Sequence, residues 1–399
     1  MRKSAEKRYA AFAQKLDVDG DFPQHLTAAF DGLYTMAYFG EDLRPYWNKD
    51  GKTSIEDLYA DAEEDYKEVM AKCYAFDRQL MADAYLAGGK EYAELCALAY
   101  RQSVSAFQMS EDSEGELLYF TPQVGPVDEY YPASPLYLRY NPDLVKAMLN
   151  PFFYYSESGK WSKPFAAHDV GTAAIAKMEK NASYAEKHWK TLTQWAEYLL
   201  ENGTDTGDQL TTDNFAGNCP HHTNLSAKGI LGIAAYARLA EMLNKKEEAE
   251  KYMDAAHEMT KEWEKAAYAG DHYRLAFDQP DSWGMKYNLI WDRLLGLNLF
   301  PERVIQKETD FYLTKMNEFG CPLDSRHSYA KVDWTVWSAS LSADRMQFRK
   351  LMLPLYKFMN ETTDRTPMAD LINTDRATIV GFTGRTVVGA YFIRLLEKE

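Results

Sequence analysis

The residues best suited to chemistry in this sequence are carboxylates that stand beside aromatic or histidine residues. Hydrolysis by paired carboxylates needs one acid that stays protonated near neutral pH and a second, ionised carboxylate that activates water. Apolar aromatic surroundings raise the pKa of a carboxyl group and so favour the protonated member of such a pair. Aspartates in loops also cap helices and turns. The candidates for this chemistry are Asp128, Glu129, Asp169, Asp213, Asp324 and Asp333.

Histidines and arginines near these acids add two further kinds of contact. The pair His221-His222 follows Asp213 closely in the sequence. Adjacent histidines rarely bind one metal ion without a third ligand nearby, so we expect a structural or substrate-binding role and no metal. Arg326 and Arg385 are able to bind a carboxylate through two parallel hydrogen bonds, which an amino-acid substrate requires and a neutral sugar does not. Pairing with a nearby aspartate is the structural alternative for each arginine.

Aromatic residues make up 14% of the chain. The pairs Trp283–Trp291 and Trp334–Trp337 would suit stacking on a substrate, and packing between helices is the equal alternative. Those that we expect in loops, and therefore nearest to a ligand, are Trp47, Tyr130, Tyr131, Trp161, Trp283 and Trp334.

Several functional classes lack their sequence signatures. No G-x-G-x-x-G follows a predicted strand, and no G-x-x-x-x-G-K-[ST], H-E-x-x-H or G-x-S-x-G occurs. A formal net charge of -15 would repel nucleic-acid phosphates and anionic lipids. No stretch reaches the roughly 20 apolar residues of a membrane span, and no apolar region follows the basic N-terminus, so we expect no signal peptide. We expect a small-molecule or glycan substrate, no cofactor, no nucleic acid and no membrane span.

The elements that must position these residues are predicted to be helices. Apolar residues three and four apart predict a helix from Ser54, capped together with Asp57, to the pair Gly88-Gly89. A second helix begins at once, so the two form an antiparallel hairpin. Further helices are predicted over 183–200, 225–243, 247–267, 286–297, 301–319, 333–342, 345–361 and 385–397. Strands are plausible only for short pieces such as Leu117–Phe120 and Tyr273–Phe277.

Consecutive helical hairpins favour an all-α protein, either a solenoid or a closed toroid. No repeat of fixed length occurs, which argues against a tetratricopeptide-like solenoid. The connections are long and polar, and loops of this kind gathered at one end of a toroid would build a concave site. They span residues 21–47, 122–142, 153–172, 204–223, 278–288, 324–334 and 360–385. We therefore predict a lead-in segment over 1–50 and one helical domain over 51–399.

The sequence resembles the glutaminase A-type six-hairpin family, which is common in fungi and Bacteroidetes. The matching motifs include Tyr38-Phe-Gly-x-x-Leu-Arg-Pro-x-Trp47, Pro164-Phe-Ala-Ala-His-Asp-Val-Gly-Thr172, Asp213-x-Phe-Ala-Gly217, Asn224-Leu-Ser-Ala-Lys228 and Leu323-Asp-Ser-Arg326. The sequence is shorter than the family pattern after Thr172 and between Thr121 and Val127. The resemblance implies an (α/α)6 toroid, a periplasmic or extracellular location, and a preceding β-rich domain that we do not find in this chain.

The resemblance also implies hydrolysis of L-glutamine to L-glutamate and ammonia. In this interpretation Asp169 and Asp213 are the acid/base candidates, with Glu129 third. The expected substrate-binding residues are His168, His221, Asp324, Arg326, Asp333, Trp283 and Trp334, with Arg326 on a substrate carboxylate and the tryptophans as walls. A glycoside hydrolase that uses the same acids is the alternative. A non-catalytic ligand-binding helical domain is the third hypothesis.

Overall fold

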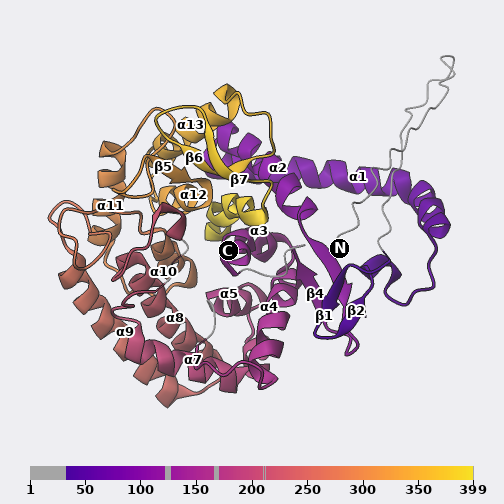
Figure 1. The fold of residues 1–399 in the computed structure, drawn as a ribbon, viewed down its shortest axis with the longest axis horizontal. Helices are drawn as coiled ribbons and strands as arrows, with labels where there is room; N and C mark the ends of the chain where they lie inside the picture. Colours follow the sequence, from indigo (N-terminus) through magenta and orange to yellow (C-terminus); the bar gives the residue numbers. More distant parts are fainter. Residues whose placement is uncertain (1–32, 122–126, 166–169, 210, 212, 399) are drawn as a thin grey trace, which may run out of the picture.

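Helices in antiparallel hairpins dominate the computed structural model, which describes residues 33–121, 127–165, 170–209, 211 and 213–398. Figure 1 shows them side by side around a circle, with the C-terminal segment near its middle. The α-helices are α1 (Ile55–Gly88), α2 (Lys90–Ser105), α3 (Val127–Tyr140), α4 (Pro142–Glu157), α5 (Val170–Glu179), α6 (Ser183–Lys187), α7 (Trp189–Asn202), α8 (Thr223–Met242), α9 (Lys246–Ala267), α10 (Ile290–Leu295), α11 (Glu302–Thr314), α12 (Val332–Ser340) and α13 (Arg345–Glu361).

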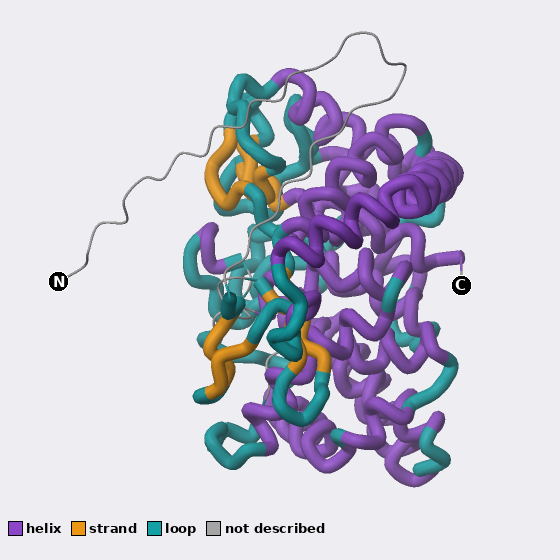
Figure 2. Tube along the Cα trace, turned by 90° about the vertical axis from the view of Figure 1, so that its right-hand side faces the viewer, coloured by secondary structure: helices purple, strands orange, loops and turns teal. Residues whose placement is uncertain are grey.

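Short strands and 3-10 helices complete the described chain. Figure 2 shows the strands along one side of the helical body. The strands are β1 (Met36–Tyr38), β2 (Glu41–Leu43), β3 (Gln108–Glu111), β4 (Leu117–Phe120), β5 (Tyr329–Lys331), β6 (Ala369–Asn373) and β7 (Ile379–Thr383). The 3-10 helices are η1 (Tyr46–Asn48), η2 (Asn214–Ala216), η3 (Tyr287–Leu289) and η4 (Thr386–Lys398).

The first hairpin forms as its sequence predicts. The Ser54 hydroxyl accepts a hydrogen bond from the Asp57 amide at 3.1 Å, and Asp57 accepts one from the Ser54 amide at 2.9 Å. Two otherwise unpaired amides at the start of α1 are thereby satisfied. Gly89 then adopts a φ of 93° between α1 and α2, a conformation that glycine tolerates best.

Helix α8 is one of the most enclosed helices of the site region. Its residues are buried on every face, whereas α9 buries one face only. Leu243, Asn244 and Lys245 connect the two helices, and Asn244 takes a left-handed φ of 61°. Because α8 is surrounded by other elements, polar side chains near its first turn enter the interior of the protein.

The C-terminal 3-10 helix η4 packs against α2, α3 and α12. The approach is close at Gly389, where an added Cβ would lie 2.6 Å from the carbonyl oxygen of Ala133. A side chain at this position would therefore force η4 away from α3. This packing confirms the predicted C-terminal helix and brings α3 into the core.

Helices α3 and α4 correct the sequence interpretation, which placed most of their residues in loops. Pro132, Pro135 and Pro151 lie inside these helices, and each lacks the amide that a helix normally uses. The lost hydrogen bonds are offset by burial, since α3 turns Ala133, Leu138 and neighbouring side chains into the core. Glu129, Tyr130 and Tyr131 are therefore helical residues, and all three are buried.

Two further expectations change in the structure. The predicted helix over 183–200 divides into α6 and α7 at His188, whose ring stacks on Phe153 with centroids 3.9 Å apart. Leu117–Phe120 is strand β4, as predicted, whereas Tyr273–Phe277 forms only isolated bridges, such as Tyr273 with Tyr268.

The sheet β5-β6-β7 forms within two segments that we expected to be loops. Its strands are antiparallel, and Lys331 of β5 stands opposite Leu371 of β6. Every residue of β6 is buried. The pairing of β6 with β5 places Asp370 of β6 beside Lys331 of β5. These two residues form part of the candidate site.

Candidate functional site

Two buried polar clusters contain most of the predicted site residues that the structure describes. The Asp213 cluster consists of Asp213, His222, Tyr287, Asp324 and Arg326. The Glu129 cluster consists of Glu129, Lys331, Asp333, Asp370 and Arg385. His168 and Asp169, which we predicted as substrate-binding and catalytic residues, lie outside the described residues.

Asp213 lies directly before η2 and is only 2% exposed. The Tyr287 hydroxyl is 3.1 Å from Oδ1 and 3.2 Å from Oδ2 of Asp213 and donates its proton to this carboxylate. His222 places Nε2 at 3.4 Å from Oδ2. Nδ1 of His222 accepts a hydrogen bond from the Leu225 amide, so the neutral ring carries its proton on Nε2, which faces Asp213. Tyr287 therefore donates to Asp213, whereas His222 Nε2 lies within 3.4 Å of it without forming a hydrogen bond.

Arg326 is held by Asp324. Its Nε and one terminal nitrogen donate to the two oxygens of Asp324 at 3.0 and 2.6 Å. The guanidinium also donates to the carbonyl oxygens of Gly217 at 2.5 Å and Asp213 at 3.5 Å. The expected role on a substrate carboxylate does not fit this geometry, because the planar fork of the guanidinium is already occupied. Arg326 instead ties the segment from Asp213 to Gly217 to the loop that carries Asp324.

The Glu129 cluster joins three carboxylates to two cations. Lys331 Nζ lies 2.6 Å from Asp333 and 3.0 Å from Asp370. Arg385 also donates to Asp370 and lies 3.5 Å from Glu129. Burial raises the pKa of Asp333 and that of Glu129, although Lys331 and Arg385 oppose these shifts. This cluster therefore holds carboxyl groups that bind a proton more readily than a carboxyl group in water.

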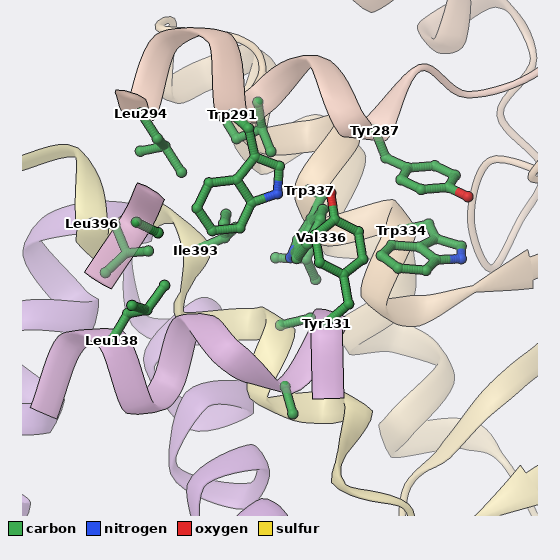
Figure 3. Packing of buried hydrophobic residues seen from close by; sticks show 14 of the residues in the cluster. Tyr131, Leu138, Tyr287, Trp291, Leu294, Trp334, Val336, Trp337, Ile393 and Leu396 are labelled. Atoms are coloured by element: carbon green, nitrogen blue, oxygen red, sulfur yellow. The ribbon is translucent and has the colours of Figure 1, made fainter. Parts of the chain in front are cut away.

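Aromatic rings lie between the two clusters. Tyr287, which donates to Asp213, stacks on Trp334 with centroids 4.1 Å apart and ring planes 6° apart. Trp334 follows Asp333 directly in the chain. Figure 3 shows these parallel rings, with Tyr131 pointing toward Trp337. Trp334 is fully buried, so its ring stacks on Tyr287 and packs edge-on against Trp337 in place of a substrate. For Trp291, Trp334 and Trp337, the helix-packing alternative applies.

Two other predicted substrate-binding residues lie apart from these clusters. His221 adopts a φ of 56° and turns its ring to Asp205, with Nδ1 2.8 Å from Oδ2. The neighbouring His222, and not His221, is the histidine that contacts Asp213. Trp283 is half-buried, and its ring packs edge-on against Phe311 at a centroid distance of 5.7 Å.

Lys228 is a site residue that the sequence interpretation missed. It lies on α8, is 7% exposed, and places Nζ 3.8 Å from the centroid of the Tyr131 ring. Burial lowers the pKa of this lysine to about 7, and the negative charges of Asp213 and Asp128 partly oppose that shift. The available signal was a single charged residue inside an otherwise apolar helical segment over 225–237.

No metal site or membrane-spanning helix was found in the part of the chain that the structure describes. No group of three histidine, cysteine or acidic residues there has an arrangement that would hold a metal ion. No helix within the same residues is long and apolar enough to cross a membrane.

Comparison with known families shows to which family this helical chain belongs. The sequence model of the glutaminase A six helical-hairpin domain matches residues 89–174 and 172–395, which is more than half of the chain. The chain belongs to this family. The two matched parts of the six-hairpin domain meet at residues 172–174. All described members of both clusters lie within the matched residues.

This six-hairpin protein also contains an N-terminal region of a second kind. A domain of unknown function, DUF5127, matches residues 2–83. The match corrects our expectation that the chain lacks the N-terminal domain that accompanies the family. Because α1 ends at Gly88, most of this long helix falls within the DUF5127 match and not within the six-hairpin match.

Two fungal proteins illustrate the relationship. Over 374 residues the chain is 29% identical to glutaminase A of Aspergillus oryzae. This alignment covers 83% of the chain and 54% of the relative. Over 483 residues the chain is 24% identical to a probable glutaminase of Arthroderma benhamiae. This second alignment covers 89% of the chain and 55% of the relative. This six-hairpin protein therefore spans about half the length of the relatives that it matches.

Proposed function

We propose that this protein hydrolyses L-glutamine to L-glutamate and ammonia at the Asp213 cluster. The observation that carries the proposal is the buried Asp213 carboxylate, which Tyr287 and His222 fix within the family-matched domain. The likeness to glutaminase A of Aspergillus oryzae supports the choice of substrate. We also infer that the hairpins form an (α/α)6 toroid and that the protein acts in the periplasm or outside the cell.

Asp213 is suited to general base catalysis on water. It takes one proton from a water molecule while the water oxygen bonds to the carbon of the substrate amide, whose π electrons move to the carbonyl oxygen. The same proton is then delivered to the amide nitrogen. The carbon–nitrogen bond breaks, the carbonyl re-forms, and ammonia leaves. Atoms and charge balance without any further reactant.

Glu129 is the second acid in this proposal. Burial raises its pKa, and its cluster adjoins the Asp213 cluster through Trp334, whose ring stacks on Tyr287 and has its centroid 5.4 Å from Lys331 Nζ. Glu129 is the alternative donor to the leaving nitrogen, and in that case the proton that Asp213 took from water returns to Glu129 after ammonia has left. This division of roles follows the different surroundings of two carboxyl groups in one site.

Substrate tests separate glutamine hydrolysis from the glycosidase alternative. The purified protein is incubated with L-glutamine and, in parallel, with a panel of oligosaccharides. We expect equal amounts of ammonia and L-glutamate from glutamine and no new reducing ends from the glycans. Reducing ends without ammonia would contradict the proposal and favour a glycoside hydrolase. Neither product would favour a ligand-binding domain.

A further inference from the structure

The start of α8 carries two buried residues, Asn224 and Lys228, whose side-chain donors form no hydrogen bond within the described protein. Asn224 is 1% exposed, and its Oδ1 accepts a hydrogen bond from the Asn288 amide at 3.3 Å. That contact identifies the other side-chain atom as the amide nitrogen. Among the described residues, Nδ2 of Asn224 has no hydrogen-bond partner. A buried donor without an acceptor costs about 1–3 kcal/mol, so its presence requires an explanation.

Lys228 repeats this arrangement one helical turn later. Its amine lies over the face of Tyr131, and it forms no hydrogen bond or ion pair with any residue of the described chain. Residues four apart on a helix share a face, so Asn224 and Lys228 project from the same side of α8. The N-terminal end of this 20-residue helix adds a partial positive charge there.

Another buried lysine of the region shows that an unpartnered amine is not a general property of this core. Lys286 is fully buried, and its Nζ donates to the carbonyl oxygens of Tyr273 at 3.1 Å and Gly284 at 2.6 Å. Glu308 lies 3.9 Å from the same nitrogen. Lys286 thus serves the fold, whereas the fold gives Lys228 nothing to bind except a ring face.

The position of these donors beside Asp213 indicates which ligand atom they bind. Asn224 accepts from the amide of Asn288, which directly follows the Asp213 donor Tyr287, and His222 at the start of α8 lies 3.4 Å from Asp213, so this end of α8 lies next to the carboxylate. A permanently charged carboxylate in this place would be repelled by Asp213. A carbonyl oxygen is neutral when it binds and gains negative charge only as water adds to the carbon.

We propose that Lys228 Nζ and Asn224 Nδ2 bind the carbonyl oxygen of a carboxamide substrate and stabilise the oxyanion that forms on it. This inference rests on the proposed amide hydrolysis and adds residues that the sequence motifs did not assign. The carbon–oxygen π electrons move to this oxygen during water attack and return when ammonia leaves. Lys228 and Asn224 are catalytic residues in this scheme because both touch the substrate.

Stability and activity respond in opposite directions if this inference is correct. Lys228→Met removes an amine that has no protein partner and keeps the length of the side chain. We expect unchanged or higher Tm together with a fall in kcat of about 100-fold or more, the range seen when one oxyanion donor is removed. The two donors bind the neutral carbonyl oxygen of the substrate less strongly than the oxyanion, so we expect KM to change only a few-fold.

Lys286→Met is the matched control, since it removes an equally buried lysine that does have partners. We expect this variant to lower Tm, because three protein oxygens lose their cation. Asn224→Asp provides the second test at the site: it keeps the acceptor for Asn288, replaces the unmatched donor, and is expected to lower kcat.

The outcomes separate the inference from the function on which it rests. Wild-type protein that releases ammonia, with Lys228→Met retaining full kcat, would overturn the inference and leave glutamine hydrolysis intact. A loss of Tm in Lys228→Met as large as that in Lys286→Met would also overturn it, because the amine would then be structural. Wild-type protein without ammonia release would reject both.

Discussion

The hydroxyl of Tyr287 donates to the carboxylate of Asp213 at 3.1 Å, and both residues are almost completely buried. The Tyr287 ring at the same time stacks on Trp334, which follows Asp333 of the other cluster in the chain. One tyrosine therefore contacts both the proposed base and the aromatic layer between the two polar clusters. This arrangement makes the position of Asp213 sensitive to changes in the core.

Tyr287→Phe tests this contact, because it removes the hydroxyl and keeps the stacked ring. We expect kcat to fall about 10-fold and the free energy of unfolding to fall by about 1 kcal/mol, the usual contribution of one hydrogen bond. Ammonia release and urea unfolding provide the two measurements. Tyr356→Phe, which removes a surface hydrogen bond to Glu94, serves as the control and should leave kcat unchanged. Unaltered activity in Tyr287→Phe would show that Asp213 does not need this donor.

Arg326→Lys tests whether the guanidinium fork positions Asp213. Lysine keeps the charge but cannot make the paired contacts to Asp324, so we expect kcat/KM to fall about 10-fold and stability to fall by about 1–3 kcal/mol. Arg303→Lys is the matched control, because Arg303 makes the same paired contact with Glu264 on the surface. Exposed pairs contribute at most about 1 kcal/mol. Equal effects in the two variants would contradict a positioning role for Arg326.

The stabilising effect of Lys228→Met should depend on pH. In the folded protein the pKa of Lys228 is lowered to about 7, against about 10.4 for an unperturbed lysine. Between these values the unfolded chain holds a proton that the folded protein has released, so the stability of the wild type rises with pH relative to the variant. Below pH 7 both states are protonated and the destabilisation by the buried ammonium is complete. Thermal unfolding should show the largest gain in Tm at pH 6 and a smaller gain at pH 9. A gain that grows with pH would be inconsistent with this lysine's environment.

Lys331 should be essential to the stability of the Glu129 cluster. Lys331→Met leaves three buried carboxylates with Arg385 as their remaining cation, and breaking a buried pair in this way costs about 3–5 kcal/mol. Guanidinium chloride unfolding measures the loss. The control is Lys357→Met, which breaks the exposed pair with Glu318 and should change stability by less than about 1 kcal/mol. A loss below 1 kcal/mol in Lys331→Met would mean that the cluster carries less charge than its geometry indicates.

The parts of the fold that follow from local signals were predictable from the sequence. The capping box at Ser54 and Asp57 and the break at Gly88-Gly89 depend on neighbouring residues, and they appear as expected. Helix α3 was not predictable in this way, because Pro132 and Pro135 indicate a loop until the packing of η4 against the helix is known. Burial in the assembled protein overrides the local preference there.

The candidate site shows the same division. Asp213, Asp324 and Arg326 were identifiable as polar residues in unusual settings, and the structure brings them together. The contact of Lys331 with Asp370 depends on the pairing of β5 with β6 across almost forty residues, which no local pattern specifies. Lys228 ends the motif Asn224-Leu-Ser-Ala-Lys228 that carries the family resemblance, but it received no role because its lack of partners is visible only in three dimensions.

The most direct test of the account compares ammonia release from L-glutamine by the wild type and by Asp213→Asn. Asparagine keeps the size of the side chain but cannot take a proton from water, so we expect kcat to fall by at least about 100-fold. Asp271→Asn, a change at an exposed aspartate, is the control and should retain full activity. Equal rates of ammonia release by the wild type and by a folded Asp213→Asn would contradict the claim that Asp213 is the base.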